Sequence, residues 1–263
     1  MLRRLTPVLV AILVLVAACQ STPAITDPAE IITQGLDATA NLKSFHMSLA
    51  LNGTFTVPNS GGSFNLDSTS LEADIDIPAK SLHLTFGVPA FLGLTGDLVV
   101  IGNDLWVKTS MTGTKWSHQT TSVSASASPG TSSPAESLDP QAMIAKVSEY
   151  LKKPGVVTKK LADVDCGDRK CYQVSVTVPS SLMASAGAVA SFDPSTVFGD
   201  GLVLNLLFDR DKLWLTEAST SVKSNTVGTF TSTLSFSKFD QAVTFSPPPS
   251  AQVTEGEFTI PGM

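Results

Sequence analysis

The stretch that decides the fold lies at residues 45–57 and reads FHMSLALNGTFTV. Apolar side chains occupy most of its odd positions, and mostly polar side chains occupy its even positions. The odd set is Phe45, Met47, Leu49, Leu51, Phe55 and Val57, and the even set is His46, Ser48, Asn52, Thr54 and Thr56. A period of two places each set on its own face, so the segment predicts an antiparallel strand that is buried on one face.

The same alternation continues after the turn at residues 59–62. A strand is predicted over residues 63–77, with Leu71, Ala73, Ile75 and Ile77 on one face and Glu72, Asp74 and Asp76 on the other. The acidic trio could indicate a calcium site. A solvated strand face explains it better, because an EF-hand loop also needs its Gly and its terminal Glu.

Further strands are predicted over residues 82–86, 98–101, 105–108, 156–164, 172–178, 202–208, 213–222 and 226–239, with another starting at 114. Tight turns separate several of them, for example at Gly102-Asn103-Asp104 and at residues 209–212. The tail over residues 245–253 carries Pro247-Pro248-Pro249, so we do not expect a central strand there.

Three helices are predicted among these strands. Asp27 and Pro28 are typical of a helix start, and an apolar stripe with a spacing of four follows to about Lys43. The second helix runs from Asp139 to about Lys153, and the third covers residues 182–192. Ten or eleven strands with three helices indicate an α+β fold built on one large antiparallel sheet. We expect residues 28–263 to form a single domain, which a Ser-rich, low-complexity insert at 117–138 interrupts.

The first nineteen residues predict export and a lipid anchor. Arg3 and Arg4 precede an apolar run over residues 5–16, which is too short to span a bilayer. Val16-Ala17-Ala18-Cys19 then matches the bacterial lipobox; the alternative is an ordinary secretory signal with a chance cysteine at its end. We therefore expect residues 1–18 to be a signal peptide, Cys19 to carry the acyl chains, and residues 19–27 to form a tether. The body is predicted to lie at the extracytoplasmic side of the cell membrane.

The charge of the mature chain limits its partners. Without Arg3 and Arg4 it carries 15 basic and 23 acidic side chains, a formal charge of −8. An acidic surface argues against a nucleic-acid partner and against a polybasic attachment to anionic lipid. Acylated Cys19 is then the predicted contact with the membrane.

Two cysteines remain after the lipobox, Cys166 and Cys171. In an oxidising compartment such a pair predicts a disulfide, here across a hairpin tip. A redox motif would more commonly have the spacing Cys-x-x-Cys. A zinc site would need partners, and the three histidines lie elsewhere in the sequence.

No enzyme motif is found. The sequence lacks a Gly-x-Ser-x-Gly elbow, a Gly-x-Gly-x-x-Gly loop, a P-loop and a His-Glu-x-x-His pair. We therefore predict no catalytic residue, no metal and no cofactor.

The order of these parts resembles the LppX/LprAFG family of actinobacterial-type lipoproteins, whose fold is LolA-like. The resemblance covers essentially the whole mature chain. Its parts are the lipobox, the helix before Phe45, the strand meander, GNDLWV at 102–107, Trp116, the helix at 140–153, FSKFDQAV at 236–243 and the proline segment at 247–249. The Ser-rich insert and the Cys166–Cys171 hairpin depart from the family pattern.

This resemblance implies a strongly curved half-barrel whose helices cover its open, concave side. Between sheet and helices it implies an apolar cavity for the acyl chains of envelope lipids or glycolipids, which such proteins carry between membranes or to an exporter. The residues expected to line the cavity are Phe45, Met47, Leu49, Leu51, Ile75, Leu84, Met183, Ala186 and Leu204. Each of them could instead belong to an ordinary core. The small side chains of residues 184–190 could leave room for a ligand or permit close packing.

Three functions compete at this point. The first is a lipid or glycolipid carrier. The second is a non-transporting envelope lipoprotein that interacts with other proteins or senses stress, and the third is a periplasmic enzyme. Fold analogy alone is a weak warrant for any of them.

Overall fold

The structure is a computed structural model that describes residues 24–56, 62–120, 148–185, 198–199, 201–224 and 226–256. In this part of the chain every strand belongs to one 14-stranded sheet. The α+β class predicted above is confirmed, with more strands than the ten or eleven expected.

The elements before the insert are one helix and seven strands. They are α2 Pro28–Ala40, β1 Ser44–Thr56, β2 Ser63–Asn65, β3 Thr69–Asp76, β4 Ser81–Val88, β5 Leu94–Ile101, β6 Asp104–Thr109 and β7 Trp116–Thr120. The structure thus places residues 117–120, the start of the predicted insert, in strand β7. The remainder of the insert lies outside the described residues.

The later elements complete the sheet. They are β8 Val157–Lys160, β9 Val164–Cys166, β10 Arg169–Pro179, α4 Ser180–Ser185, β11 Gly201–Asp209, β12 Leu215–Ser224, β13 Gly228–Ser237, the 3₁₀ turn η3 Ser250–Gln252 and β14 Val253–Glu255. Residues 148–151 are helical as well. Residues 152 and 153, where the sequence predicted the end of this helix, form a turn, and residues 139–147 lie outside the described residues. The third predicted helix, for which the sequence offers Ser180 or Ser181 as the start, begins at Ser180, and residues 186–192 are likewise not described.

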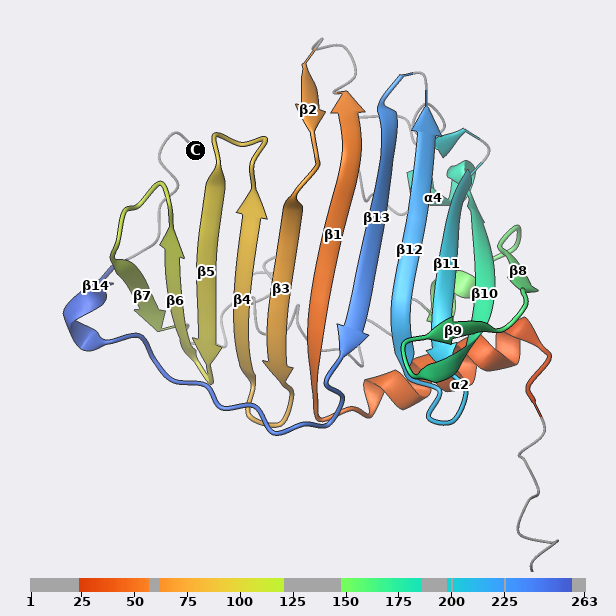
Figure 1. The fold of residues 1–263 in the computed structure, drawn as a ribbon, viewed down its shortest axis with the longest axis horizontal. Helices are drawn as coiled ribbons and strands as arrows, with labels where there is room; N and C mark the ends of the chain where they lie inside the picture. Colours follow the sequence, from red (N-terminus) through yellow and green to blue (C-terminus); the bar gives the residue numbers. More distant parts are fainter. Residues whose placement is uncertain are drawn as a thin grey trace, which may run out of the picture.

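The strands follow the order β14-β7-β6-β5-β4-β3-β1-β13-β12-β11-β10-β8, with β2 on β1 and β9 on β10. The sheet is open, because β14 and β8 end the path and do not pair with each other. Figure 1 shows β3 to β12 side by side, whereas β10 and β11 overlap, so the sheet turns away from the plane of the view at that end. Every pairing is antiparallel except that of β14 with β7, which makes the sheet mixed rather than purely antiparallel.

Strand β1 holds the two halves of the sheet together. It pairs with β3 on one side and with β13, the last long strand, on the other. The alternation that predicted it is confirmed, but the strand predicted at 63–77 is broken into β2 and β3. The break comes at residues 66–68, where Asp67 accepts a hydrogen bond from the backbone N–H of Gly53 (2.6 Å) and Ser68 adopts a left-handed φ of 65°.

Helix α2 starts as the sequence predicts and ends three residues early. Asp27 caps it by accepting a hydrogen bond from the N–H of Ala29 (3.0 Å), and Asn41 is the C-cap. Its buried side packs on β10 and β11 in one core, the α2 core. This core consists of Ile31, Ile32, Leu36, Tyr172, Val174, Val176, Val178, Leu206 and Phe208.

The C-terminal segment crosses one end of the sheet. After β13 it runs past the lower ends of β1, β3, β4 and β5 to the far edge (Figure 1), where β14 pairs with β7. Its path begins with Asp240, whose N–H donates to the carbonyl of Ser44 (2.8 Å) and whose carboxylate accepts from the N–H of Lys43 (2.7 Å). None of the helices among the described residues has the length and apolar character needed to cross a membrane.

Candidate functional site

One face of the sheet is apolar over most of its width. Residues directly opposite each other in antiparallel strands share a face, so the register identifies its members. Leu49 lies opposite Leu71 of β3 and Leu234 of β13. Further along, Ala73 lies opposite Leu84, and Leu84 lies opposite Leu98. The row continues in the other direction through β12 to Leu206 and Val174.

Parts of this face are buried in clusters. Helix α2 contacts β8, β10 and β12, and α4 contacts β10 and β11, so the α2 core covers that end. Near the start of β1 a second cluster contains Leu42, Phe45 and Phe239, with Met47 and Ile75 packed against it.

The middle of the face is different. Its side chains are only partly buried, and they belong to none of the four buried clusters formed by the described residues. We call it the open apolar face, and it consists of Leu49, Leu51, Leu71, Leu84, Phe86, Leu98 and Leu234. These side chains are half-buried, as are Thr85 and Ser235, which point to the opposite face. A face of leucines exposed to this degree has the chemistry to receive an apolar ligand.

The predicted cavity residues therefore separate into groups. Leu49, Leu51 and Leu84 lie on the open apolar face, whereas Leu204 and Met183 pack against the α2 core. Phe45, Met47 and Ile75 form the second cluster with its neighbours. Ala186 and Cys19 lie outside the described residues.

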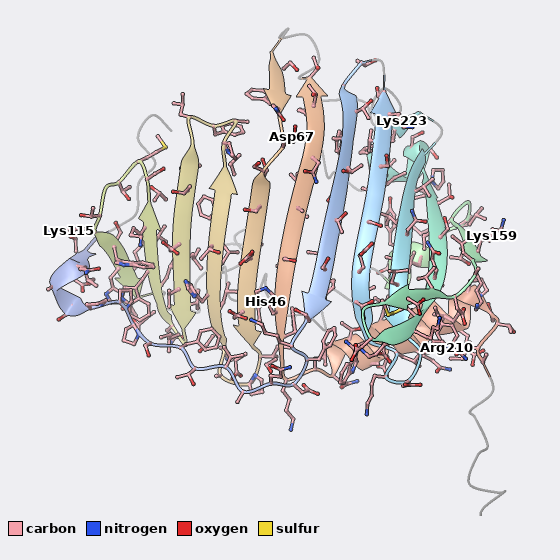
Figure 2. All side chains as sticks on the ribbon, viewed as in Figure 1. His46, Asp67, Lys115, Lys159, Arg210 and Lys223 are labelled. Carbon is pink, nitrogen blue, oxygen red and sulfur yellow. A yellow bond between two sulfur atoms is a disulfide. The ribbon has the colours of Figure 1, made fainter. Side chains whose placement is uncertain are left out.

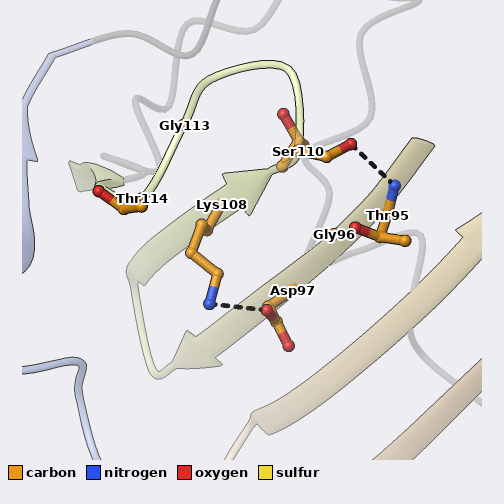
Figure 3. Close-up of a pocket in the computed structure, with 8 residues that line it drawn as sticks. Thr95, Gly96, Asp97, Lys108, Ser110, Gly113 and Thr114 are labelled. Carbon is orange, nitrogen blue, oxygen red and sulfur yellow. Dashed lines mark hydrogen bonds and ion pairs between the residues drawn. The ribbon is translucent and has the colours of Figure 1, made fainter. Parts of the chain in front are cut away.

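A shallow pocket of about 270 Å³ lies near the upper ends of β5 and β6 (Figure 3). Thr95, Asp97, Lys108 and Ser110 contribute polar groups to it, together with Gly96, Thr109, Gly113 and Thr114. The Lys108 ammonium lies 2.9 Å from the Asp97 carboxylate, and the hydroxyl of Ser110 accepts from the N–H of Thr95 (3.1 Å). The pocket is thus small and polar, unlike the apolar cavity that the resemblance implies.

The polar face of the sheet carries contacts between histidines and carboxylates. His46 and Asp74 face each other across β1 and β3 at 2.8 Å, and His83 lies 3.8 Å from Asp97. Figure 2 shows His46 near the lower end of β1, and charged residues along the edges and ends of the sheet. The part of the chain that the structure describes contains no group of three or more His, Cys, Asp or Glu side chains that could hold a metal. The acidic trio of β3 alternates with apolar residues as a solvated face does.

A histidine clamp holds the last strand on the sheet edge. His118 of β7 lies between two carboxylates, with Nδ1 2.8 Å from Glu255 and Nε2 3.0 Å from Asp104, and it stacks on Trp106 at 4.9 Å. The hydrogen bond to Glu255 raises the pKa of His118 above its ordinary value. Desolvation opposes this rise, and the bond to Asp104 adds to it. The hydrogen bonds from His118 and Thr120 in turn lower the pKa of Asp104.

The sequence did not reveal this clamp. The prolines exclude a central strand over residues 245–253, but the β-branched Val253 and Thr254 that follow them suit the edge strand β14. Val253 also packs on a buried cluster of Val99, Trp106 and Trp116. The two tryptophans belong to this same cluster, and His118 lies directly opposite Trp106.

The predicted disulfide between Cys166 and Cys171 is confirmed, and the two Cα atoms are 5.9 Å apart. It closes the hairpin tip between β9 and β10. Arg169 within that tip donates to the buried carboxylate of Asp209 (2.8 Å). Asp209 also accepts from two backbone N–H groups of its own turn, so the tip is attached to the turn between β11 and β12.

No family model and no curated protein matches the sequence of this chain. Solved structures do match the fold. LprF from Mycobacterium bovis is 15% identical, with a TM-score of 0.51 over 84% of this chain and 96% of that one. The lipoprotein LppX from Mycobacterium tuberculosis is 18% identical, with a TM-score of 0.48 over 82% and 96%. MucB in complex with MucA(peri) is 10% identical, with a TM-score of 0.34 over 86% of this chain and 58% of that one. The chain therefore has the fold of LprF, as the resemblance in its sequence predicted.

Proposed function

We propose that this chain is a lipoprotein that binds the acyl chains of cell-envelope lipids or glycolipids on its open apolar face and transfers them. It acts at the extracytoplasmic side of the membrane, where acylated Cys19 holds it. The observation that carries the proposal is the open apolar face itself. A sheet whose one face is apolar over most of its width must cover that face, and acyl chains are a suitable cover.

Two further observations support it. The fold that the chain shares with LprF agrees with the LolA-like fold that the sequence resemblance implies, and lipid carriage is the function expected from that resemblance. The lipobox and the short tether would keep the sheet beside a membrane, which is the source of such ligands. Passage of the lipid to an exporter is compatible with this arrangement and forms part of the same proposal.

The test compares two neighbouring residues of β4. Leu84 points to the open apolar face, and Thr85 points to the polar face. The full chain carrying Leu84→Asn or Thr85→Asn is purified, its lipids are extracted, and lipid per protein is measured by mass spectrometry. Loss of the apolar contact between Leu84 and the bound lipid should lower the amount of bound lipid about tenfold. The Thr85→Asn variant should bind as much lipid as the wild type.

The proposal fails if the wild-type chain carries no lipid and binds no fluorescent fatty acid. It also fails if both substitutions lower bound lipid equally, because the effect would then not depend on the face. In a separate experiment, Cys19→Ala should release the protein from the membrane and leave lipid binding intact.

A further inference from the structure

Large apolar side chains gather at the end of the sheet opposite α2. The turn between β4 and β5 presents Leu92, which is 99% exposed, and Phe91, which is 58% exposed. The loop between β6 and β7 presents Met111, which is 53% exposed. Phe64 of β2 stacks on Phe91 with ring centroids 5.5 Å apart. We call these four residues the apolar rim; β2 and the β4–β5 turn mark it in Figure 1, at the upper ends of the strands.

The rim is held in place by its own turns. The N–H of Phe91 donates to the carbonyl of Val88 (3.0 Å), and the N–H of Leu94 donates to the carbonyl of Phe91 (2.8 Å). Leu92 has a φ of 52°, a left-handed conformation that is unfavourable for a leucine. The turn holds this conformation at a cost of about 1–3 kcal/mol. This cost is consistent with a function that needs a large apolar side chain at the tip.

The two loops are also connected to each other. The N–H of Ser110 donates to the carbonyl of Thr95 (2.8 Å), and the hydroxyl of Ser110 accepts from the N–H of Thr95 (3.1 Å). Met111 and Leu92 therefore extend from neighbouring positions at one end of the sheet. The open apolar face reaches the same end, because the ring of Phe86 lies directly against Gly96, the residue after Thr95.

The surroundings of the rim have the layered chemistry of a membrane interface. Behind the apolar tips lie the hydroxyls of Thr95, Ser110 and Thr114 around the pocket of Figure 3. Lys115 is exposed at the base of the loop between β6 and β7 (Figure 2), in a chain that is acidic as a whole. Apolar tips that enter the acyl region, with hydroxyls and an ammonium at the level of the head groups, are typical of interfacial binding. An anionic phospholipid head group would complement the lysine.

We propose that the apolar rim docks on a lipid bilayer and inserts Leu92, Phe91 and Met111 into its interface. Docking would place the end of the open apolar face against the membrane, so that an acyl chain could move between the two without crossing water. This inference rests on the proposed function, and it names the surface through which the lipid enters and leaves.

The experiment is vesicle flotation of the mature chain, residues 19–263, with Cys19→Ala, so that neither the signal peptide nor an acyl chain contributes. Vesicles consist of phosphatidylcholine alone or of phosphatidylcholine with phosphatidylglycerol. The test variant is Leu92→Asn, because asparagine accepts the left-handed conformation and the turn should fold at least as well. The matched control is Val157→Asn on β8 at the other edge of the sheet, where the valine is 61% exposed.

The wild type should float with both kinds of vesicle, and more strongly with phosphatidylglycerol. Leu92→Asn should lower the bound fraction at least about tenfold, and Val157→Asn should leave it unchanged. The proposal is overturned if the wild type does not float, if Leu92→Asn floats like the wild type, or if both substitutions weaken flotation equally. Binding of a fluorescent fatty acid in solution is measured in parallel and should be the same in all variants. A wild type that floats but binds no fatty acid would refute the lipid-binding function and leave the rim as a membrane contact.

Discussion

Substitution of Gly35 by alanine should loosen the attachment of α2 to the sheet. Gly35 is buried in the middle of the helix, where it faces Phe208 of β11. A Cβ atom on Gly35 would overlap two carbons of the Phe208 ring, Cδ1 and Cε1, and would lie 3.1 Å from the carbonyl oxygen of Leu213. The ring cannot swing away, because Phe208 is fully buried in the α2 core.

The magnitude follows from two opposed effects. In an exposed helix a change from Gly to Ala stabilises by about 1 kcal/mol. Overpacking of a dense core costs about 1–3 kcal/mol, and the overlap of a Cβ with a rigid ring and a nearby backbone oxygen places this site at the upper end of that range. We therefore expect a net loss of about 1–2 kcal/mol in the free energy of unfolding.

The assay is urea denaturation of the wild type, Gly35→Ala, Phe208→Leu and the double variant. Because the smaller leucine makes room for the new methyl group, the double variant should lose less stability than the sum of the two single losses. A Gly35→Ala variant that is more stable than the wild type, or losses that simply add, would refute the close approach of α2 to β11.

Three further outcomes are expected. Replacement of both Cys166 and Cys171 by alanine should lower the free energy of unfolding by about 2 kcal/mol, which is the loop-entropy value for such a short ring. The reduced wild type should lose the same free energy of unfolding in urea denaturation. Asp27→Ala should remove the cap of α2 and cost about 1 kcal/mol, whereas Asp27→Asn should cost little. The pKa of His118 is raised in the folded protein. The stabilisation of β14 by the two hydrogen bonds of His118 is therefore complete below the ordinary histidine pKa of about 6.5, and it is lost as the pH rises through the raised pKa. Hydrogen exchange at the N–H of Gly256, which donates to the carbonyl of His118, should therefore accelerate with pH beyond its intrinsic rate; His118→Gln should abolish this excess, and an unchanged excess would contradict the clamp.

Much of the sheet could be predicted from local patterns. The alternation at residues 45–57 predicted β1 and the apolar identity of its face, and the turn at Gly102-Asn103-Asp104 predicted the hairpin of β5 and β6. Such patterns are short in range, so they carried no information on the break at residues 66–68. That break depends on Gly53, a residue more than ten positions away on another strand.

The candidate site was predicted only in part. Leu49, Leu51 and Leu84 were expected to line a ligand site, and the structure places them together on the open apolar face. Phe45 and Leu204, which follow the same alternation, belong to clusters or pack against one. The period of a strand identifies the sheet face to which a side chain points. The elements that bury that side chain are distant in the sequence, so the period does not reveal them.

The sequence by itself determined the α+β class, the apolar faces of β1 and β3, the start of α2 at Asp27 and the disulfide pair, because these depend on side-chain period, capping and the number of cysteines. Its lipobox also determined where we expect the protein to act. Only the tertiary structure decided that β1 joins β3 to β13, that α2 covers one end of the sheet, and that His118 meets Glu255 across 137 positions. The physical reason is that strand pairing and the cover of a sheet face involve residues far apart in the sequence, whose surfaces have similar polarity. Many such surfaces are compatible with the same local pattern, and the packing of the whole chain selects among them.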